Sequence, residues 1–438
     1  MTQPSVWEQI LDYSHRPNPY QLYAELRKTP VTVAEDGSYL VSTYAEIVSL
    51  LHDPRVSSDV GRNPQAAAAA AAGARTTGTE TAGTGTAGTG EEAEEGAGEA
   101  RGLGPSFLLM DPPDHDRLRR LAMRHFGPPN TPGRVAGLEP RMVEIVTGLI
   151  DDLAGRTRVD LVDDFAYPFP VAVICELLGV PVGDERRFRV WVDMALESTD
   201  PGVDAETQQQ KRTEAGKWLL DYMTDLVAAH RQAPGTDLLS AMADDDGPEG
   251  RMTNEELVSL GLLLLVAGHE TTVNLISNGI LTLLHHPDML ARLRDDPDLA
   301  IPMVEELLRF EPPVHFLPFR TALDDIEIAG TTIPAGASIT PVLAAGNRDP
   351  LHTRDPDSFL PDRENNDHLG FGSGIHLCFG APLARLEAQI ALAEFAGRLD
   401  NPRLAEDPPL YRPSPILRGP RHLAVDIDGV RAAVPGTE

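Results

Sequence analysis

One stretch of the chain, residues 253–287, does most to limit what the protein can fold into. It reads TNEELVSLGLLLLVAGHETTVNLISNGILTLLHHP and is rich in apolar residues at helical spacing. Thr253 and Glu256 occupy the two positions of a capping box, and Pro287 closes the pattern. A helix of this length extends roughly 50 Å, so the sequence predicts one helix that crosses a whole domain.

Other segments add many helices and a few strands. Residues 31–42 have the pattern of a hairpin with a turn at Asp36 and Gly37, and residues 322–344 have that of short strands with turns at Gly330 and Gly336. Helical spacing is present in PYQLYAELRKT, TYAEIVSLLHDP, PRMVEIVTGLIDDLA, PVAVICELLGV, EAGKWLLDYMTDLVAAHRQ and IPMVEELLRFEPP. We expect a mainly α fold with a minor β portion, in a single domain spanning residues 1–438.

Residues 65–101 break this pattern. They contain an alanine run, a threonine-glycine stretch and an acidic cluster, with almost nothing that a core could bury. We interpret them as a disordered insertion within the domain.

Charge and cysteine usage exclude several classes of protein. The 67 acidic and 37 basic residues give a formal charge of −30, which argues against a nucleic-acid partner because phosphates would be repelled. Two cysteines cannot form a disulfide framework. The start lacks a signal-peptide pattern, and the apolar run 257–268 is too short to span a bilayer. We expect a soluble, cytoplasmic protein without a membrane partner.

The sequence FGSGIHLCFG, Phe371–Gly380, holds Cys378, one of the two cysteines. A probable helix follows it directly, and N–H groups at a helix start favour an anion, so we expect them to lower the pKa of the thiol. Gly372, Gly374 and Gly380 allow close backbone approach, while Phe371 and Phe379 can shield the sulfur. Cys175, in contrast, has the surroundings of an inert core residue.

Three other readings of the cysteine loop remain open at this point. Cys378, His376 and His368 are a conceivable zinc set, although their spacing fits no common finger. A nucleophilic cysteine needs a paired base, for which His376 is poorly placed. The cysteine can also be without a role.

The loop resembles the haem-binding signature of the cytochrome P450 family, phenylalanine-x-x-glycine-x-x-x-cysteine-x-glycine. The resemblance implies haem b as cofactor, with Cys378 as the iron ligand and Phe371 and Gly380 in the binding loop. A thiolate ligand pushes electron density onto the iron and favours O–O cleavage. The overall style is that of soluble, actinomycete-like bacterial members, with a long central helix over the haem.

Three further segments match the family in the expected order. EELLR and FLPDR imply a structural unit of Glu306, Arg309 and Arg363 behind the haem. AGHETT, in the long helix, implies a groove at Ala267 and Gly268, where the helix widens locally beside the iron. There Thr271 would hydrogen-bond the oxygen that the iron activates, and Glu270 would connect it to a proton supply.

Contacts to the haem propionates are implied by DPPDHDRLRRL, by PFRTAL and by the cysteine loop. They fall on His115, Arg119, Arg320 and His376. Arginine suits this role because its planar fork pairs with carboxylates. The neighbouring residues Arg117, Arg120 and Arg124 form a basic patch that is either a solvated face or a docking site for an acidic ferredoxin.

The function that the resemblance implies is a haem-thiolate monooxygenase. It would take electrons from a ferredoxin and ferredoxin reductase, split O2, and hydroxylate or epoxidise an apolar secondary-metabolite, macrolide, terpenoid or steroid-like molecule. Substrate contacts are expected from Ser106–Met110, from around Leu265, from Val314–Phe319 and from Ile416 and Leu417. Alternatives are a peroxide-driven or oxidative-coupling haem-thiolate enzyme and a non-catalytic haem sensor.

Deleting residues 65–101 should leave the fold and the haem spectrum unchanged, because the segment offers little to bury. Circular dichroism and the absorption spectrum of the purified variant measure this directly. Loss of soluble haem protein would show instead that the insertion is structural.

Overall fold

The computed structural model describes residues 4–63, 106–127, 131–181, 183–184, 190–191, 204–318 and 320–432. The predicted insertion 65–101 lies outside these residues. The described helices are α1 (Val6–Leu11), α2 (Tyr20–Leu26), α3 (Tyr44–Leu51), α6 (Asp114–Phe126), α7 (Pro132–Ala136), α8 (Glu139–Asp151), α9 (Pro168–Leu178), α11 (Ala205–Gln232), α12 (Leu238–Asp244), α13 (Asn254–His285), α14 (Pro287–Asp295), α15 (Ala300–Phe310), α16 (Leu343–Gly346) and α17 (Ala381–Arg398).

Short strands form four small sheets in the described residues. The largest has the order β1-β2-β8-β5-β3, in which only β2 and β8 pair in parallel. The others are β10-β11-β4, β12-β9 and β6-β7. The strands are β1 (Val31–Val33), β2 (Tyr39–Val41), β3 (Val56–Ser57), β4 (Arg158–Asp160), β5 (Arg320–Ala322), β6 (Ile326–Ile328), β7 (Thr331–Ile333), β8 (Ser338–Pro341), β9 (Leu399–Asp400), β10 (Arg403–Leu404), β11 (Ala424–Asp426) and β12 (Gly429–Val430).

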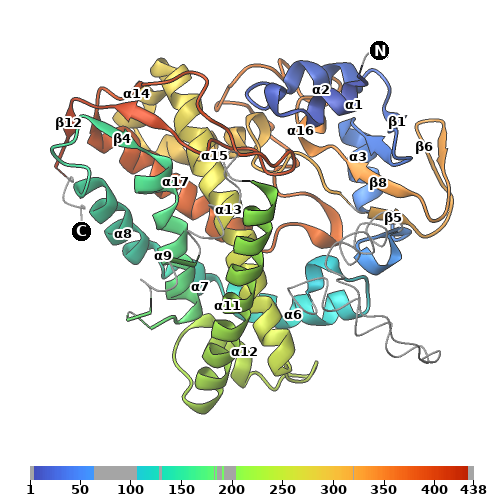
Figure 1. Cartoon of the computed structure of the whole chain (residues 1–438), viewed down its shortest axis with the longest axis horizontal. Helices are drawn as coiled ribbons and strands as arrows, with labels where there is room; N and C mark the ends of the chain where they lie inside the picture. The colour runs from blue at the N-terminus through green and yellow to red at the C-terminus, as the bar shows by residue number, and fades with distance from the viewer. Residues whose placement is uncertain are drawn as a thin grey trace.

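The long helix α13 runs through the middle of the molecule, as predicted (Figure 1). It packs against α9, α11 and α17, and most of its residues are buried because it is apolar on nearly all sides. By length and composition α13 could cross a membrane, but 72% of its most apolar window is buried inside the protein. Its apolar character is therefore that of a core helix.

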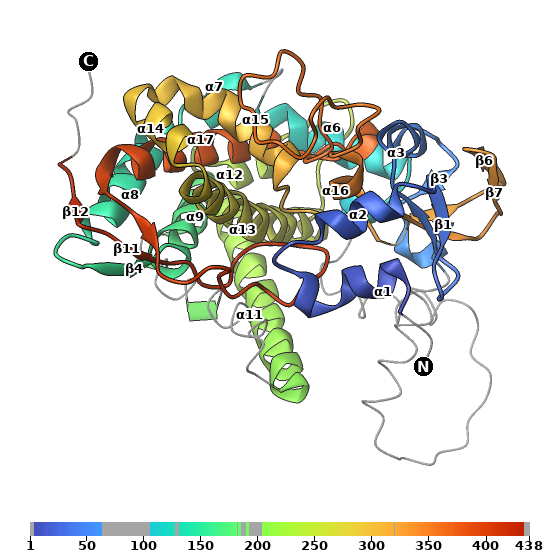
Figure 2. The same cartoon turned by 90° about the horizontal axis from the view of Figure 1, so that it is seen from above.

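Helices and strands separate into two regions. Figures 1 and 2 show α8, α9, α14 and α17 on one side of the molecule, while α1–α3 and the five-stranded sheet lie on the other. The larger hydrophobic cluster fills the helical side, and two smaller clusters lie under the sheet and the N-terminal helices. The cysteine loop lies between β8 and α17 in the chain, so it can connect both regions.

Several local predictions are confirmed. Thr253 caps α13, with the reciprocal bonds of a capping box to Glu256. Val31 pairs with Val41 in the predicted hairpin, whose Gly37 has a φ of +83°. The turns at Gly330 and Gly336 also have positive φ. Cys175 lies in α9 and is 2% exposed, as expected of a core residue.

A buried ionic network connects α15 to the segment before the cysteine loop. The Glu306 carboxylate accepts bonds of 2.7 and 2.8 Å from Arg309, and both side chains are fully buried. Arg363 donates to the same carboxylate at 3.0 Å. The two guanidinium groups also donate to backbone carbonyls of the loop, including those of Pro356 and Ser358. The structure thus brings together the three residues that the motifs indicated.

Replacing Glu306 with Gln should destabilise the protein by about 3–5 kcal/mol, because it leaves the Arg309 cation buried without a counter-charge. Urea unfolding followed by circular dichroism measures the effect. Arg292→Ala is the matched control, since its pair with Asp362 is largely solvent-exposed and should contribute less than about 1 kcal/mol. Equal effects of the two substitutions would contradict this account.

Candidate active site

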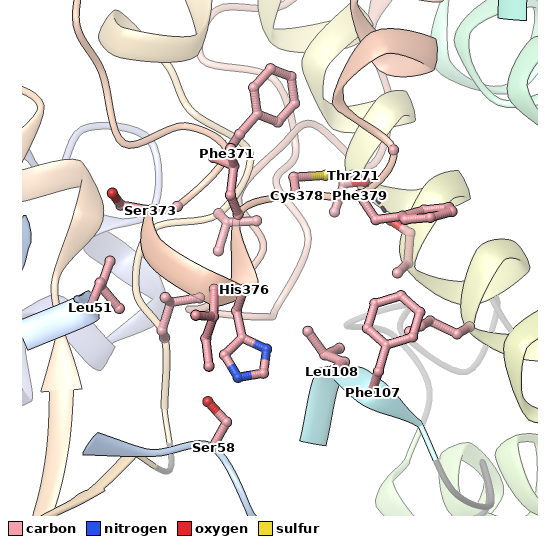
Figure 3. Close-up of a pocket in the computed structure, with 18 of the residues that line it drawn as sticks. Leu51, Ser58, Phe107, Leu108, Thr271, Phe371, Ser373, His376, Cys378 and Phe379 are labelled. Carbon is pink, nitrogen blue, oxygen red and sulfur yellow. Dashed lines mark hydrogen bonds between the residues drawn. The ribbon is translucent and has the colours of Figure 1, made fainter. Parts of the chain in front are cut away.

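A cavity of about 700 Å³ lies between the cysteine loop and α13. Cys378, Phe371 and Gly380 line it from the loop, and Ala267 and Thr271 line it from the helix. Figure 3 shows the sulfur of Cys378 close to Thr271 in projection, with Phe107 and His376 at other parts of the wall. The volume is typical of a site for a cofactor or small molecule.

Backbone geometry determines the shape of the cysteine loop. Gly372 and Gly374 have φ values of +72° and +71°, which favour glycine. A Cβ at Gly374 would lie 2.0 Å from the carbonyl oxygen of Leu51, so this position also needs glycine for space. Gly380 has a φ of −80° and no protein atom lies within 4 Å of an added Cβ, so its close approach to a cofactor stays a prediction.

The thiol of Cys378 is exposed to this cavity and yet surrounded by protein. Burial raises its pKa, while backbone N–H groups of Gly380 and Ala381 and the nearby Arg119 and Arg385 lower it. Burial wins, so the predicted net lowering of the pKa by the helix start is wrong for the protein alone. The N–H groups still point at the sulfur, and coordination of a metal cation deprotonates a thiol outright.

A cluster of charged residues that the sequence analysis did not identify contacts the cysteine loop at Phe371. Arg385 of α17 makes two bonds to Glu305, of 2.7 and 3.0 Å, and its guanidinium lies 4.6 Å from the ring centre of Phe371. His368 bonds the same carboxylate at 3.1 Å through Nε2, and its Nδ1 accepts from Gly370. His368 is therefore already engaged, which argues against the zinc reading.

No cation site of at least three His, Cys, Asp or Glu ligands forms around Cys378 in the described chain. The one such grouping there is Asp160, Asp163 and His422, on a different part of the molecule. Its carboxylates are held by backbone N–H groups, His422 and Arg421.

On the helix side, Ala267, Gly268, Glu270 and Thr271 all line the cavity. The Thr271 hydroxyl donates to the carbonyl of Ala267 at 2.6 Å, and that of Thr272 donates to Gly268 at 2.7 Å. The helix continues through these residues as an uninterrupted α-helix, so the expected local widening is not present. Within this continuous helix, each hydroxyl forms an additional hydrogen bond to the carbonyl four residues earlier.

One partly buried acid, Glu270, and one buried acid, Glu387, face this part of the cavity. Burial raises the pKa of Glu270, and the charge of Arg412 opposes that rise. Glu387 of α17 is 2% exposed; burial raises its pKa well above the usual range, against a hydrogen bond from Thr272. Sequence reasoning missed Glu387, although a glutamate among the apolar residues of LEAQIAL was a usable signal.

Basic groups gather at one end of the cavity. Arg320, Arg119 and His376 line it, and none of them makes an ion pair with a carboxylate within the described residues. Burial lowers the pKa of Arg320 to about 10, with Asp111 opposing. Burial, Arg320 and His115 lower the pKa of His376 to about 3, so its ring is neutral. The end of the cavity is thus short of negative charge.

His115 is not among the residues that line the cavity, but its ring centre lies 4.5 Å from that of His376, so its contact to a propionate stays a prediction. Its Nδ1 lies 2.8 Å from a carboxylate oxygen of Asp116, and its Nε2 is buried without a partner among the described residues. Both ring nitrogens of His376 lack partners in the same sense. Buried donors and acceptors of this kind are seldom left unpaired in proteins.

The residues therefore fit haem. The thiol lies on one wall, and small residues of α13 face it. Arg320 and Arg119, which have no carboxylate partner among the described residues, gather with the neutral His376 where two propionates need them. Cys378 would hold the iron, and Arg320, Arg119 and His376 would hold the carboxylates.

Apolar side chains line the remainder of the cavity. Phe107, Leu108, Val314, Leu317 and Leu417 do so, as predicted. Around Leu265, as predicted, Leu263, Leu264 and Val266 line the cavity, while Leu265 itself and Ile416 do not. Phe319 lies outside the described residues.

The predicted basic patch on α6 is neutralised. Arg117 bonds Glu256 at 2.6 Å, Arg120 bonds Glu249, and Arg124 bonds Asp245 at 2.7 Å. These acids come from the loop before α13 and from its first turn, which the sequence could not place beside α6.

Comparison with known proteins agrees with this geometry. Residues 83–400 match the family model described as Cytochrome P450. The chain is 39% identical to Cytochrome P450 107B1 of Saccharopolyspora erythraea, over 92% of this chain and 93% of that one. It is also 39% identical to the Vitamin D(3) 25-hydroxylase of Pseudonocardia autotrophica, over 95% of each.

Among solved structures, CYP109E1 of Bacillus megaterium in complex with corticosterone superposes with a TM-score of 0.79. It is 30% identical in sequence, and the match covers 94% of this chain and 99% of that one. The fold, the length matched and the cysteine loop all agree. The chain therefore belongs to the cytochrome P450 family and is a monooxygenase that uses haem b.

Proposed function

We propose that this enzyme hydroxylates or epoxidises an apolar, polycyclic or macrocyclic molecule. In the balanced reaction, substrate C–H, O2, two electrons and two protons give the alcohol and water. Haem b supplies the activation of O2. The observation that supports this best is one cavity that joins a thiol, an acid-alcohol pair and an apolar wall.

The substrate class follows from the wall of the cavity. Leucine, valine and phenylalanine side chains dominate it away from the basic end, so a polar substrate would lose hydrogen bonds on entry. One relative is named for acting on vitamin D(3), and one similar structure holds corticosterone. Both are large and apolar, which supports a steroid-like, terpenoid or macrolide substrate and a place in secondary metabolism.

We infer that a ferredoxin and its reductase supply the electrons, and that the enzyme works in the cytoplasm. The likeness to bacterial relatives supports both inferences. Because the arginines of α6 are paired internally, an acidic ferredoxin must compete with Glu249 and Asp245 for them. Residues 1–438, insertion included, are proposed to form one domain.

Within this proposal Cys378 is the iron ligand. Its sulfur accepts bonds from Gly380 and Ala381 and faces the cavity, so a thiolate there is stabilised once iron is bound. Glu306, Arg309 and Arg363 hold the preceding segment in place.

Glu270 and Thr271 are proposed to deliver protons. The Thr271 hydroxyl lies at the cavity wall, and its bond to Ala267 fixes its direction. Glu270 precedes it, and burial raises the pKa of its carboxyl, which favours the protonated form that a proton donor needs.

Cys378→Ser should abolish the red-shifted absorption band that a thiolate ligand gives to the reduced, carbon-monoxide-bound protein. Serine cannot provide a thiolate, while the rest of the loop is unchanged. Cys175→Ser is the control and should keep the band, because Cys175 lies in the core of α9. An unchanged spectrum in Cys378→Ser would mean that the iron is held elsewhere.

Thr271→Ala should keep consuming reductant with a ferredoxin system but release hydrogen peroxide in place of product, with coupling reduced roughly 10²-fold or more. The assay substrate is chosen among apolar candidates by their effect on haem absorption. Thr272→Ala is the control from the next position. Full coupling in Thr271→Ala would refute the proposed relay, whereas equal turnover of the wild type with peroxide alone would favour the peroxide-driven alternative.

A further inference from the structure

The face of α13 beside Glu270 carries polar residues at four-residue spacing. Glu270, Asn274 and Asn278 lie on one side of the helix, one turn apart. Asn274 and Asn278 are 0% and 2% exposed. Buried amides in the middle of an apolar helix are costly unless they have partners.

The C-terminal loop, residues 411–420, packs against this face. The Asn278 amide donates to the carbonyl of Arg418 at 3.0 Å. One turn nearer to Glu270, Asn274 presses against Gly419, where an added Cβ would lie 2.2 Å from Oδ1. Glycine at this position thus lets the loop approach the polar face closely.

Arg412 belongs to the same loop, and its backbone N–H donates to the carbonyl of Gly419 at 3.0 Å. The residue is 1% exposed, and all three guanidinium nitrogens lack a hydrogen-bond partner among the described residues. Both polar atoms of the Asn274 side chain lack partners in the same way. So many unpaired buried atoms at one contact indicate internal water, which commonly satisfies such groups.

Several neighbouring groups shift the pKa of Arg412 through their charge. Glu270 is the strongest favourable charge that acts on it, Tyr167 and Asp163 are also favourable, and Arg421 is unfavourable. His269, next to Glu270, is neutral, because burial and Arg412 lower its pKa to about 3. Arg412 is therefore the cation whose charge acts on Glu270, without a direct ion pair between the two side chains.

A connection to the surface exists on the same side. Arg421 bonds Asp163 at 2.8 Å, and the Asp163 side chain is 44% exposed. Asp163 lies in the turn Val162–Ala166, which packs against α13. A path from solvent can thus follow Asp163, Arg421 and Arg412 to Glu270.

We propose that Arg412 is a positioning residue for proton supply: with Asn274 it holds a buried water cluster that carries protons from the Asp163–Arg421 pair to Glu270. Each catalytic cycle consumes two protons, and Glu270 passes them on to Thr271 at the cavity wall. The proposal rests on the proton-delivering role proposed above for Glu270 and Thr271.

The test compares Arg412→Met, which keeps length and removes the charge, with Arg412→Lys, which restores it. In the haem-loaded enzyme, Arg412→Met should lower coupling roughly tenfold, the size of effect that a lost supporting partner has at a metal site. Arg412→Lys should recover most of it. Arg398→Met removes another arginine that is 4% exposed, at the end of α17, where it bonds Asp151 and the carbonyl of Arg431, and controls for the loss of a buried guanidinium.

A spectroscopic readout separates positioning from folding. The infrared band of the protonated Glu270 carboxyl is assigned by its loss in Glu270→Gln. Removing the nearby cation disfavours the carboxylate, so in Arg412→Met this band should persist to higher pH than in the wild type. An unchanged titration of the band in a folded Arg412→Met protein would overturn the proposal.

Asn274→Leu provides a second test if Arg412→Met does not fold. Without water, replacing two unpaired buried atoms by an apolar group of similar shape should stabilise the protein and leave coupling unchanged. With the water cluster, coupling should fall. Stabilisation with full coupling would refute the proposal, whereas full coupling in Glu270→Gln would refute the relay on which it rests.

Discussion

The thiol of Cys378 and the Glu270–Thr271 pair reach one cavity from elements far apart in the chain, and the rest of the fold keeps them there. The helix that carries the acid-alcohol pair is buried along most of its length, so packing from several sides fixes its position. The thiol is placed by two positive-φ glycines and by the first turn of α17. A flat cofactor needs both walls at a defined separation, which rigid packing provides.

Burial of charge is the second theme of the molecule. Glu306 and Arg309 neutralise each other completely inside the protein, so their network stiffens the segment before the cysteine loop. Arg320, in contrast, is buried without an anion, and the neutral His376 ring has no hydrogen-bond partner among the described residues; the propionates of haem would complete both. Arg412 and Asn274 have unpaired atoms on the other side of the site, where water completes them in our proposal. Each set of polar groups without a protein partner marks a place where, in our account, the cofactor or water binds.

Local features were predictable because short-range chemistry determines them. The capping box of α13, the hairpin turn at Gly37 and the glycine turn at Gly336 depend on neighbours within a few residues. The spacing of the motifs was equally informative, since it implied which residues belong to the site. Predictions failed where a local effect competed with an effect of the whole fold. At Cys378, the nearby backbone N–H groups lower the pKa of the thiol, but burial by the surrounding protein raises it more.

The sequence by itself determined the long core helix, the cysteine loop, the ionic triad and the family. Only the tertiary structure decided which face of each element meets the cavity: Leu264 lines it and Leu265 does not, although both are apolar neighbours. It also decided the partners of charged groups, placing Glu249 on Arg120 and Arg412 near Glu270. The physical reason is that helix rotation and loop position follow from packing over the whole chain, which no local pattern encodes.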